Sequence, residues 1–119
     1  SQVGAACHTG NRTCFFNNIV KKEYVEKNPL TVLESVYAVI VDRMKNPKED
    51  SYTNAVMEKG IDEILKKLGH ECTEIILAAK NPDSDDLKFE ISDFMYHCMI
   101  LMAQKNITWA EIAGELAQR

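Results

Sequence analysis

The chain has 119 residues, of which 45% are hydrophobic and 27% are charged, and its formal net charge is −4. These values are typical of one small globular domain with some additional chain. The acidic balance argues against a general nucleic-acid binder, and no apolar run is long enough to span a membrane. No signal peptide is visible, and the four cysteines do not indicate a disulfide framework, so we expect a cytoplasmic protein.

The first 30 residues differ from the rest. Residues 1–22 are rich in small polar residues without a helical period, which predicts a non-helical tail, and residues 23–30 predict a polar linker. The tail contains Cys7 and Cys14, and two thiolates are too few for a stable zinc site. Cys72 and Cys98 lie within helical patterns, where we expect them to be buried as small apolar residues.

From residue 31 onward the hydrophobic period is helical. The expected helices cover, in chain order, residues 31–45, a short piece ending at Lys59, 61–80, 85–105 and a last segment from Thr108. Capping boxes are predicted at Thr31-x-x-Glu34 and Thr108-x-x-Glu111. Asp83 or Ser84 can cap the helix that follows them. The fold class is therefore all-α, an antiparallel bundle of about four helices.

The two long helices carry an apolar stripe that acids interrupt. The first stripe consists of Ile61, Ile64, Leu65, Leu68, Glu71, Cys72, Ile75 and Ala79. The second consists of Leu87, Glu90, Ile91, Phe94, His97, Cys98 and Leu101. Glu71 and Glu90 thus stand where apolar residues are expected, and an unpaired carboxylate there is costly.

Each of these acids has a second acid three residues later, in Glu71-x-x-Glu74 and Glu90-x-x-Asp93. Residues three apart share a helix face, so an antiparallel hairpin of the two helices would bring four carboxylates together. Like charges at that density require a cation, and a hard divalent metal such as Mg²⁺ or Mn²⁺ suits oxygen ligands. The alternative is that all four are ordinary surface acids.

Further short motifs accompany the acids across residues 31–119. They are Asp42-Arg43, Asn46-Pro47, Ser51-Tyr52-Thr53, Lys59-Gly60, Lys66-Lys67-x-Gly69, Ala78-Ala79-Lys80 and Tyr96-His97. With them the chain resembles the phosphoribosyl-ATP pyrophosphatases, which belong to an all-α, MazG-like superfamily of nucleotide pyrophosphohydrolases. The resemblance implies Mg-dependent hydrolysis of phosphoribosyl-ATP to phosphoribosyl-AMP and pyrophosphate, the second step of histidine biosynthesis. It also implies a homodimer or a larger homo-oligomer.

The resemblance assigns roles to individual residues. The four acids, Glu71, Glu74, Glu90 and Asp93, would be the catalytic and metal-binding residues, while Lys67, Lys59 and Arg43 would bind the substrate phosphates. His97 is expected to be a core histidine, with support of the metal ligands as the second interpretation, and Tyr96 and Trp109 are expected to pack. Two positions depart from the family pattern. His70 replaces a glutamate, and Ala55 replaces a basic residue.

A second resemblance covers the tail. Residues 4–15, Gly-Ala-Ala-Cys-His-Thr-Gly-Asn-Arg-Thr-Cys-Phe, resemble the end of phosphoribosyl-AMP cyclohydrolase, which is fused ahead of the pyrophosphatase in many organisms. Residues 1–22 are then expected to be a remnant of that domain, without cyclohydrolase activity. Cys7 and Cys14 match two of its zinc ligands, but zinc is not expected here because the remaining ligands are missing.

Two other functions remain open at this point. A house-cleaning nucleoside triphosphate pyrophosphohydrolase would use the same acids on free nucleotides. A catalytically silent helical interaction module would bind no metal. The Ser51-Tyr52-Thr53 and Lys59-Gly60 motifs favour the histidine enzyme over the first of these.

Overall fold

The computed structural model describes residues 28–119, and within that range the chain forms five helices and no strand. They are α3 (Thr31–Lys45), α4 (Tyr52–Lys59), α5 (Ile61–Ala78), α6 (Asp85–Gln104) and α7 (Trp109–Ala117). The all-α prediction is confirmed, and the expected helix ends agree within two residues. The predicted tail, most of the linker, Cys7 and Cys14 lie outside the described residues.

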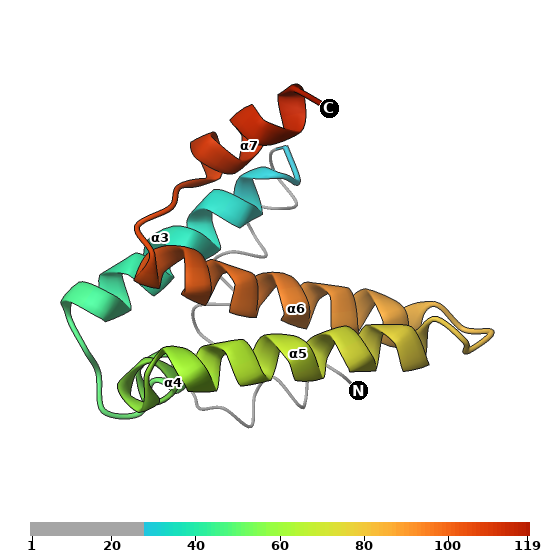
Figure 1. Ribbon diagram of the computed structural model, residues 1–119, viewed down its shortest axis with the longest axis horizontal. Coiled ribbons are helices and arrows are strands. Elements are labelled where there is room, and N and C mark those ends of the chain that lie inside the picture. The colour runs from blue at the N-terminus through green and yellow to red at the C-terminus, as the bar shows by residue number, and fades with distance from the viewer. Residues whose placement is uncertain (1–27) are drawn as a thin grey trace.

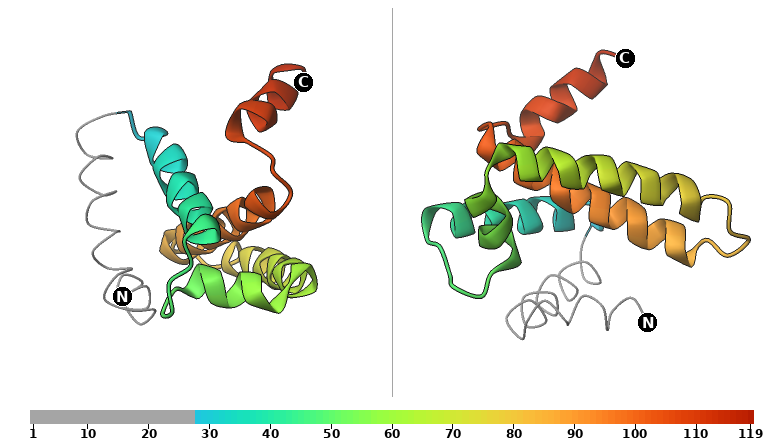
Figure 2. Two further views of the ribbon diagram at one scale, coloured as in Figure 1. Left: turned by 90° about the vertical axis from the view of Figure 1, so that its left-hand side faces the viewer. Right: turned by 60° about the horizontal axis from the view of Figure 1, so that its bottom comes forward.

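The long helices α5 and α6 run side by side in opposite directions and form the hairpin that carries all four acids (Figure 1). Helix α3 packs across α6, and the short α4 lies at the base of α5 (Figures 1 and 2). Gly60 separates α4 from α5 with φ of +98°, a conformation that residues with a Cβ rarely adopt. This turn directs α4 back toward the acids of the hairpin.

The core lies where α3, α4, α5 and α6 meet. Its buried members are Ile40, Val56, Ile64, Met99, Ile100, Met102 and Ala103. Helix α7 contributes no buried residue, but α7 and the loop before it are each tied to α3 by one hydrogen bond. The Trp109 indole N–H donates to the Leu33 carbonyl at 3.2 Å, and the Tyr37 hydroxyl donates to the Ile107 carbonyl at 2.6 Å. Trp109 therefore packs as expected and also anchors the chain end.

Of the two predicted capping boxes, one is confirmed and one is wrong. Thr108 and Glu111 form the expected capping box. Thr31 does not, because a turn over residues 28–30 precedes it and its hydroxyl donates to the Asn28 carbonyl at 2.7 Å. At the start of α6 the cap comes from Asp83, whose Oδ1 accepts from the Asp85 backbone N–H at 2.9 Å, while the Ser84 side chain makes no capping bond.

The predicted apolar stripes were wrong at several positions. Ile61, Leu65, Cys72, Ala79 and Ile91 are exposed, although Ile64 is fully buried and Leu68 and Ile75 are partly buried. The apolar sector of α5 is wider than the surface that the other helices cover, so its outer part faces solvent. No helix within residues 28–119 is long and apolar enough to cross a membrane.

Candidate active site

Glu71 is the acid that the fold buries. It lies on the face of α5 that packs against α6, with 8% of its surface exposed, and its Oε1 has no hydrogen-bond partner among the described residues. Burial raises the pKa of Glu71 from 4.5 to about 8. A hydrogen bond with Asp93 and the charges of Asp93, Glu90 and Glu74 contribute to the same rise. The predicted position of Glu71 within the core stripe is therefore confirmed.

The other three acids lie around Glu71 and are partly exposed. Burial raises the pKa of Glu90, and the charges of Glu74 and Asp93 raise it further, whereas a hydrogen bond with Glu71 lowers it. Glu90 thus stands at the edge of the core rather than inside it, unlike the sequence-based expectation. The two acid pairs face each other across one hairpin, close enough for every member to affect the ionisation of another.

The residues present suit a hard divalent cation. All four acids offer carboxylate oxygens, the ligand type that Mg²⁺ and Mn²⁺ prefer. The buried, unpartnered Glu71 Oε1 is an acceptor that lacks a donor, and a cation would compensate its loss of hydration. Mutual repulsion among the acids would be relieved in the same way.

His97 lies beside Glu71 and Asp93 at the centre of the acid cluster. One ligand atom from each of Glu71, Asp93 and His97 lies within 4.8 Å of the others. His97 is 2% exposed, and both its ring nitrogens have partners. Nδ1 lies 2.8 Å from the Asp93 carbonyl oxygen and Nε2 lies 2.7 Å from the Tyr52 hydroxyl. The expected core histidine is therefore present, with its hydrogen bonds satisfied.

Two hydrogen bonds join the start of α4 to α6 beside the acids. Besides the Tyr52–His97 bond, the Thr53 and Tyr96 hydroxyls bond to each other. Burial raises the pKa of the Tyr52 hydroxyl above 10.0, and the charges of Asp93 and Glu71 raise it further. Tyr52 therefore stays protonated and can donate.

Sequence reasoning missed this arrangement, because it treated Tyr96 as packing and Tyr52 only as part of a matched motif. A usable signal was present in the sequence. Tyr96 and His97 follow Asp93 by three and four residues and so lie one turn along α6 from it.

The three predicted phosphate-binding cations take different positions. Lys67 on α5 is half-buried, with its Nζ 3.6 Å from a Glu63 carboxylate oxygen and 5.9 Å from the centre of the Tyr52 ring. Arg43 has a side chain only 16% exposed, pairs with Asp42 at 3.2 Å and acts electrostatically on Tyr96. Lys59 is exposed at the end of α4. The fold thus brings Lys67 and Arg43 to the two tyrosines beside the acids.

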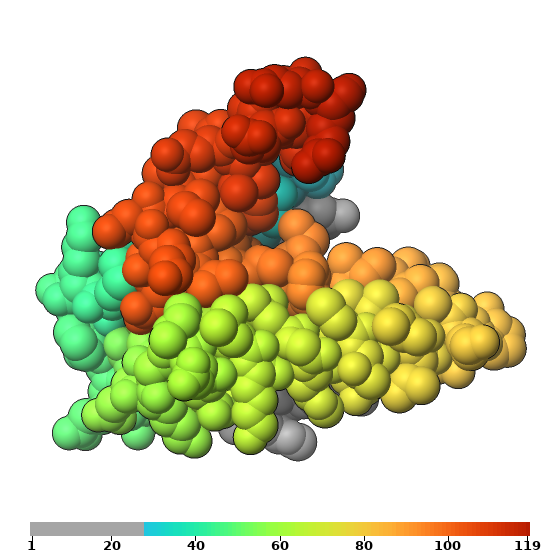
Figure 3. All heavy atoms as spheres, viewed as in Figure 1, coloured from blue at the N-terminus to red at the C-terminus, as the bar shows by residue number. Residues whose placement is uncertain are grey.

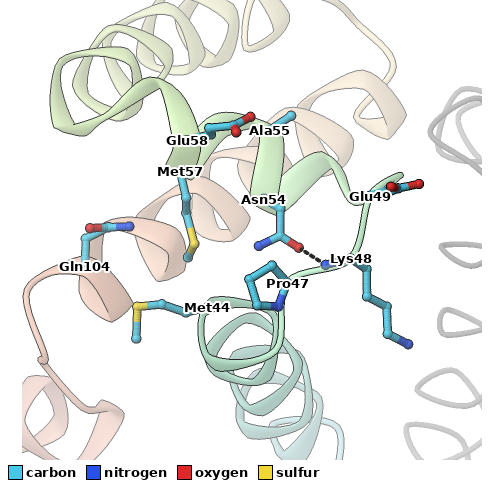
Figure 4. Close-up of a pocket in the computed structure, with 9 residues that line it drawn as sticks. All are labelled: Met44, Pro47, Lys48, Glu49, Asn54, Ala55, Met57, Glu58 and Gln104. Carbon is cyan, nitrogen blue, oxygen red and sulfur yellow. Dashed lines mark hydrogen bonds between the residues drawn. The ribbon is translucent and has the colours of Figure 1, made fainter.

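The two positions that depart from the family pattern have distinct surroundings. His70 is exposed, and its Nε2 lies 3.6 Å from a Glu74 carboxylate oxygen, so it neighbours the outer edge of the acid cluster. Ala55 lines an open pocket that α3, α4 and the end of α6 surround (Figure 4). None of the four acids lines that pocket, so Ala55 belongs to a different surface.

The Asn54 side chain makes two hydrogen bonds that stabilise the wall of this pocket. Its side-chain oxygen accepts from the Lys48 backbone N–H at 2.9 Å (Figure 4), and its amide donates to the Arg43 carbonyl at 2.8 Å. These bonds fix the loop between α3 and α4. They therefore also fix the start of α4, where Tyr52 and Thr53 lie.

Comparison with known proteins identifies the family of this chain. The family model described as phosphoribosyl-ATP pyrophosphohydrolase matches residues 33–119. The phosphoribosyl-ATP pyrophosphatase of Clostridium novyi is 51% identical over 90 residues, covering 76% of this chain and 82% of that protein. The Bacillus cereus protein of the same name is 47% identical over 93 residues, covering 78% and 84%.

A longer relative matches nearly the whole chain. The histidine biosynthesis bifunctional protein HisIE of Caldanaerobacter subterraneus is 45% identical over 116 residues, which are 98% of this chain and 55% of that protein. The chain thus spans about half the length of the bifunctional relatives that it matches. The family match covers every described helix except the first two residues of α3. The chain belongs to the phosphoribosyl-ATP pyrophosphohydrolase family.

Proposed function

We propose that this chain hydrolyses phosphoribosyl-ATP to phosphoribosyl-AMP and pyrophosphate, the second step of histidine biosynthesis, in the cytoplasm. The observation that carries the proposal is the buried Glu71 carboxyl, with its unpartnered Oε1, among three further acids on one hairpin. The family membership of residues 33–119 and the names of the shorter relatives support the same substrate.

The proposed metal ligands are Glu71, Glu74, Glu90 and Asp93, and the proposed ion is Mg²⁺, with Mn²⁺ as a substitute. When bound, the ion would neutralise triphosphate oxygens and lower the pKa of a water molecule. Hydrolysis would break the bridge between the α- and β-phosphorus atoms. The water oxygen would join one phosphorus and the bridging oxygen would stay with the other, so that pyrophosphate leaves. One of the carboxylates accepts the proton of the water.

Positive side chains complete the proposed substrate site. Lys67 lies one turn before Glu71 on α5, and its ammonium can exchange Glu63 for a phosphate oxygen. Arg43 approaches from α3 on the side of Tyr96. Lys59 is the third proposed phosphate ligand, and it is free to move because its side chain is exposed.

The test is pyrophosphate release from phosphoribosyl-ATP in the presence of Mg²⁺. We expect activity in the wild type, its loss in Glu71→Gln and after chelation of the metal, and no change in Glu115→Gln. Glu115 is the matched control because it is exposed on α7. Equal rates for wild type and Glu71→Gln would contradict the proposal. Faster turnover of deoxynucleoside triphosphates would indicate the house-cleaning enzyme, and no turnover with no metal binding would indicate a silent module.

We further propose that the chain forms a homodimer through the outer face of the hairpin. Ile61, Leu65, Cys72 and Ile76 lie on one side of α5 at spacings of four, seven and four residues, and all are exposed. Ile91 on α6 is also exposed. In Figure 3 no other described element covers the side of α5 that faces the viewer. Within the described residues, the core of the single chain has only seven buried residues and does not cover this outer strip. A second copy would bury the strip.

Two leucines of α5 give a matched test of the dimer. Leu65 is 48% exposed on the outer strip, and Leu77 is 58% exposed about 120° away around the same helix. We expect Leu65→Glu to produce monomers in analytical ultracentrifugation and Leu77→Glu to leave the dimer intact. A monomeric wild type, or a dimer that withstands Leu65→Glu, would contradict this interface.

Residues 1–22 are proposed to correspond to the end of a cyclohydrolase domain, 23–30 to a linker and 31–119 to the pyrophosphatase domain. The match to the bifunctional relative extends over 98% of the chain, whereas the matches to the shorter relatives cover 76% and 78%. The additional matched residues therefore lie ahead of the family match. Cys7 and Cys14 fall in this part, and no zinc site is proposed for them.

A further inference from the structure

The partly buried Tyr52 and the buried His97 form a hydrogen-bonded pair beside the proposed metal site, where α4 packs against α6. Ser51 caps α4, with its hydroxyl accepting from the Asn54 backbone N–H at 3.2 Å, and this places Tyr52 at the first helical position. From there its hydroxyl reaches His97 Nε2 at 2.7 Å, across 45 residues of sequence. The two rings meet edge to face, with centroids 5.7 Å apart.

The hydrogen bonds determine where the imidazole carries its proton. A backbone carbonyl can only accept, so the bond of 2.8 Å to the Asp93 carbonyl requires a hydrogen on Nδ1. In the neutral ring Nε2 then has a lone pair, which accepts the Tyr52 hydroxyl hydrogen. Neither nitrogen has a lone pair left for a metal ion. The Nδ1 atom also lies 3.7 Å from Asp93 Oδ1.

We propose that His97 and Tyr52 are positioning residues of the metal site, and that His97 is not a metal ligand although it lies within 4.8 Å of two acids. Tyr52 holds the imidazole in one orientation. The imidazole in turn bonds to the Asp93 backbone carbonyl and so fixes the turn of α6 from which the Asp93 carboxylate projects. This inference rests on the proposed function. Partners that orient a metal ligand in this way typically change metal affinity by about 10- to 100-fold when they are removed.

Tyr52 also contacts the substrate side of the site through its ring. The Lys67 ammonium lies 5.9 Å from the ring centroid, within the range of a cation–π contact. The hydroxyl therefore acts on Asp93 through its hydrogen bond to His97, and the ring contacts the Lys67 ammonium. Tyr52→Phe removes the first contact and keeps the second, whereas Tyr52→Leu removes both.

The experiment measures Mn²⁺ affinity of the full chain by electron paramagnetic resonance, without substrate, for wild type, Asp93→Asn, Tyr52→Phe and Tyr96→Phe. Tyr96→Phe is the matched control, because it also removes a hydrogen bond between α4 and α6, the one to Thr53. We expect Tyr52→Phe to weaken Mn²⁺ binding about tenfold and Tyr96→Phe to bind as the wild type does. In turnover, Tyr52→Phe should keep the KM for substrate at saturating metal, and Tyr52→Leu should raise it.

Each outcome separates this inference from the proposed function. Equal Mn²⁺ binding by wild type and Asp93→Asn would overturn the metal site itself. If Asp93→Asn loses affinity while Tyr52→Phe matches Tyr96→Phe, the metal site stands and the positioning role is overturned. Electron spin-echo measurements give a third readout. Nitrogen-14 coupling from a directly bound imidazole in the wild type would make His97 a ligand and contradict our assignment.

Discussion

Burial of Glu71 among three other acids should make the metal-free protein less stable as the pH rises. The pKa of Glu71 rises from 4.5 to about 8 on folding, so between these values the folded chain keeps a proton that the unfolded chain has lost. The free energy of unfolding then falls by about 1.4 kcal/mol per pH unit across this window. Above pH 8 both states have lost this proton, and the free energy of unfolding stops falling.

Glu71→Gln tests this loss of stability, because the amide has the same shape and does not ionise. We expect urea unfolding in the presence of a chelator to show similar stability for the two proteins near pH 5. At pH 8 the variant should be more stable, by several kcal/mol at most, since the ionised Glu71 is absent. Adding Mg²⁺ should restore the wild type at pH 8 and leave the variant unaffected, because a bound cation favours the ionised carboxylate.

The control is Glu115→Gln, whose pH profile should follow that of the wild type because Glu115 is exposed on α7. Parallel unfolding curves for wild type and Glu71→Gln from pH 5 to pH 8 would refute the reasoning. The same refutation would follow if Mg²⁺ stabilised both proteins equally, since the cation would then act away from Glu71.

Three further outcomes are expected. Ile100→Ala should lower the free energy of unfolding by about 2–5 kcal/mol, because the side chain is fully buried in the core; a loss below 1 kcal/mol would mean that the site is loosely packed. Thr108→Ala should cost about 1 kcal/mol in the same assay by removing the capping box of α7, whereas Thr108→Ser should cost little. His70→Glu should tighten Mg²⁺ binding about two- to fivefold at low salt, measured by calorimetry, because it adds charge beside Glu74; unchanged or weaker binding would place Glu74 outside the site.

The sequence by itself determined the helices and the presence of the acid pairs. Helix length, the 3.6-residue period and the capping box at Thr108 are local properties, and an acid three residues after another must share its helix face. The short loop between α5 and α6 made the antiparallel hairpin predictable as well. The unusual position of Glu71 was also predictable, because its carboxylate occupies a position of the helical period that is otherwise apolar.

Only the tertiary structure decided which side of each helix is buried. The apolar sector of α5 is wide enough for two choices, and packing against α4 and α6 selected Ile64 and Glu71 while Leu65 and Cys72 stayed outside. The same packing placed Glu90 at the edge of the core rather than inside it. The Tyr52–His97 bond joins residues 45 positions apart, and no local period encodes such a contact. The neighbours that surround Asp93 therefore follow from how α4 docks against α6.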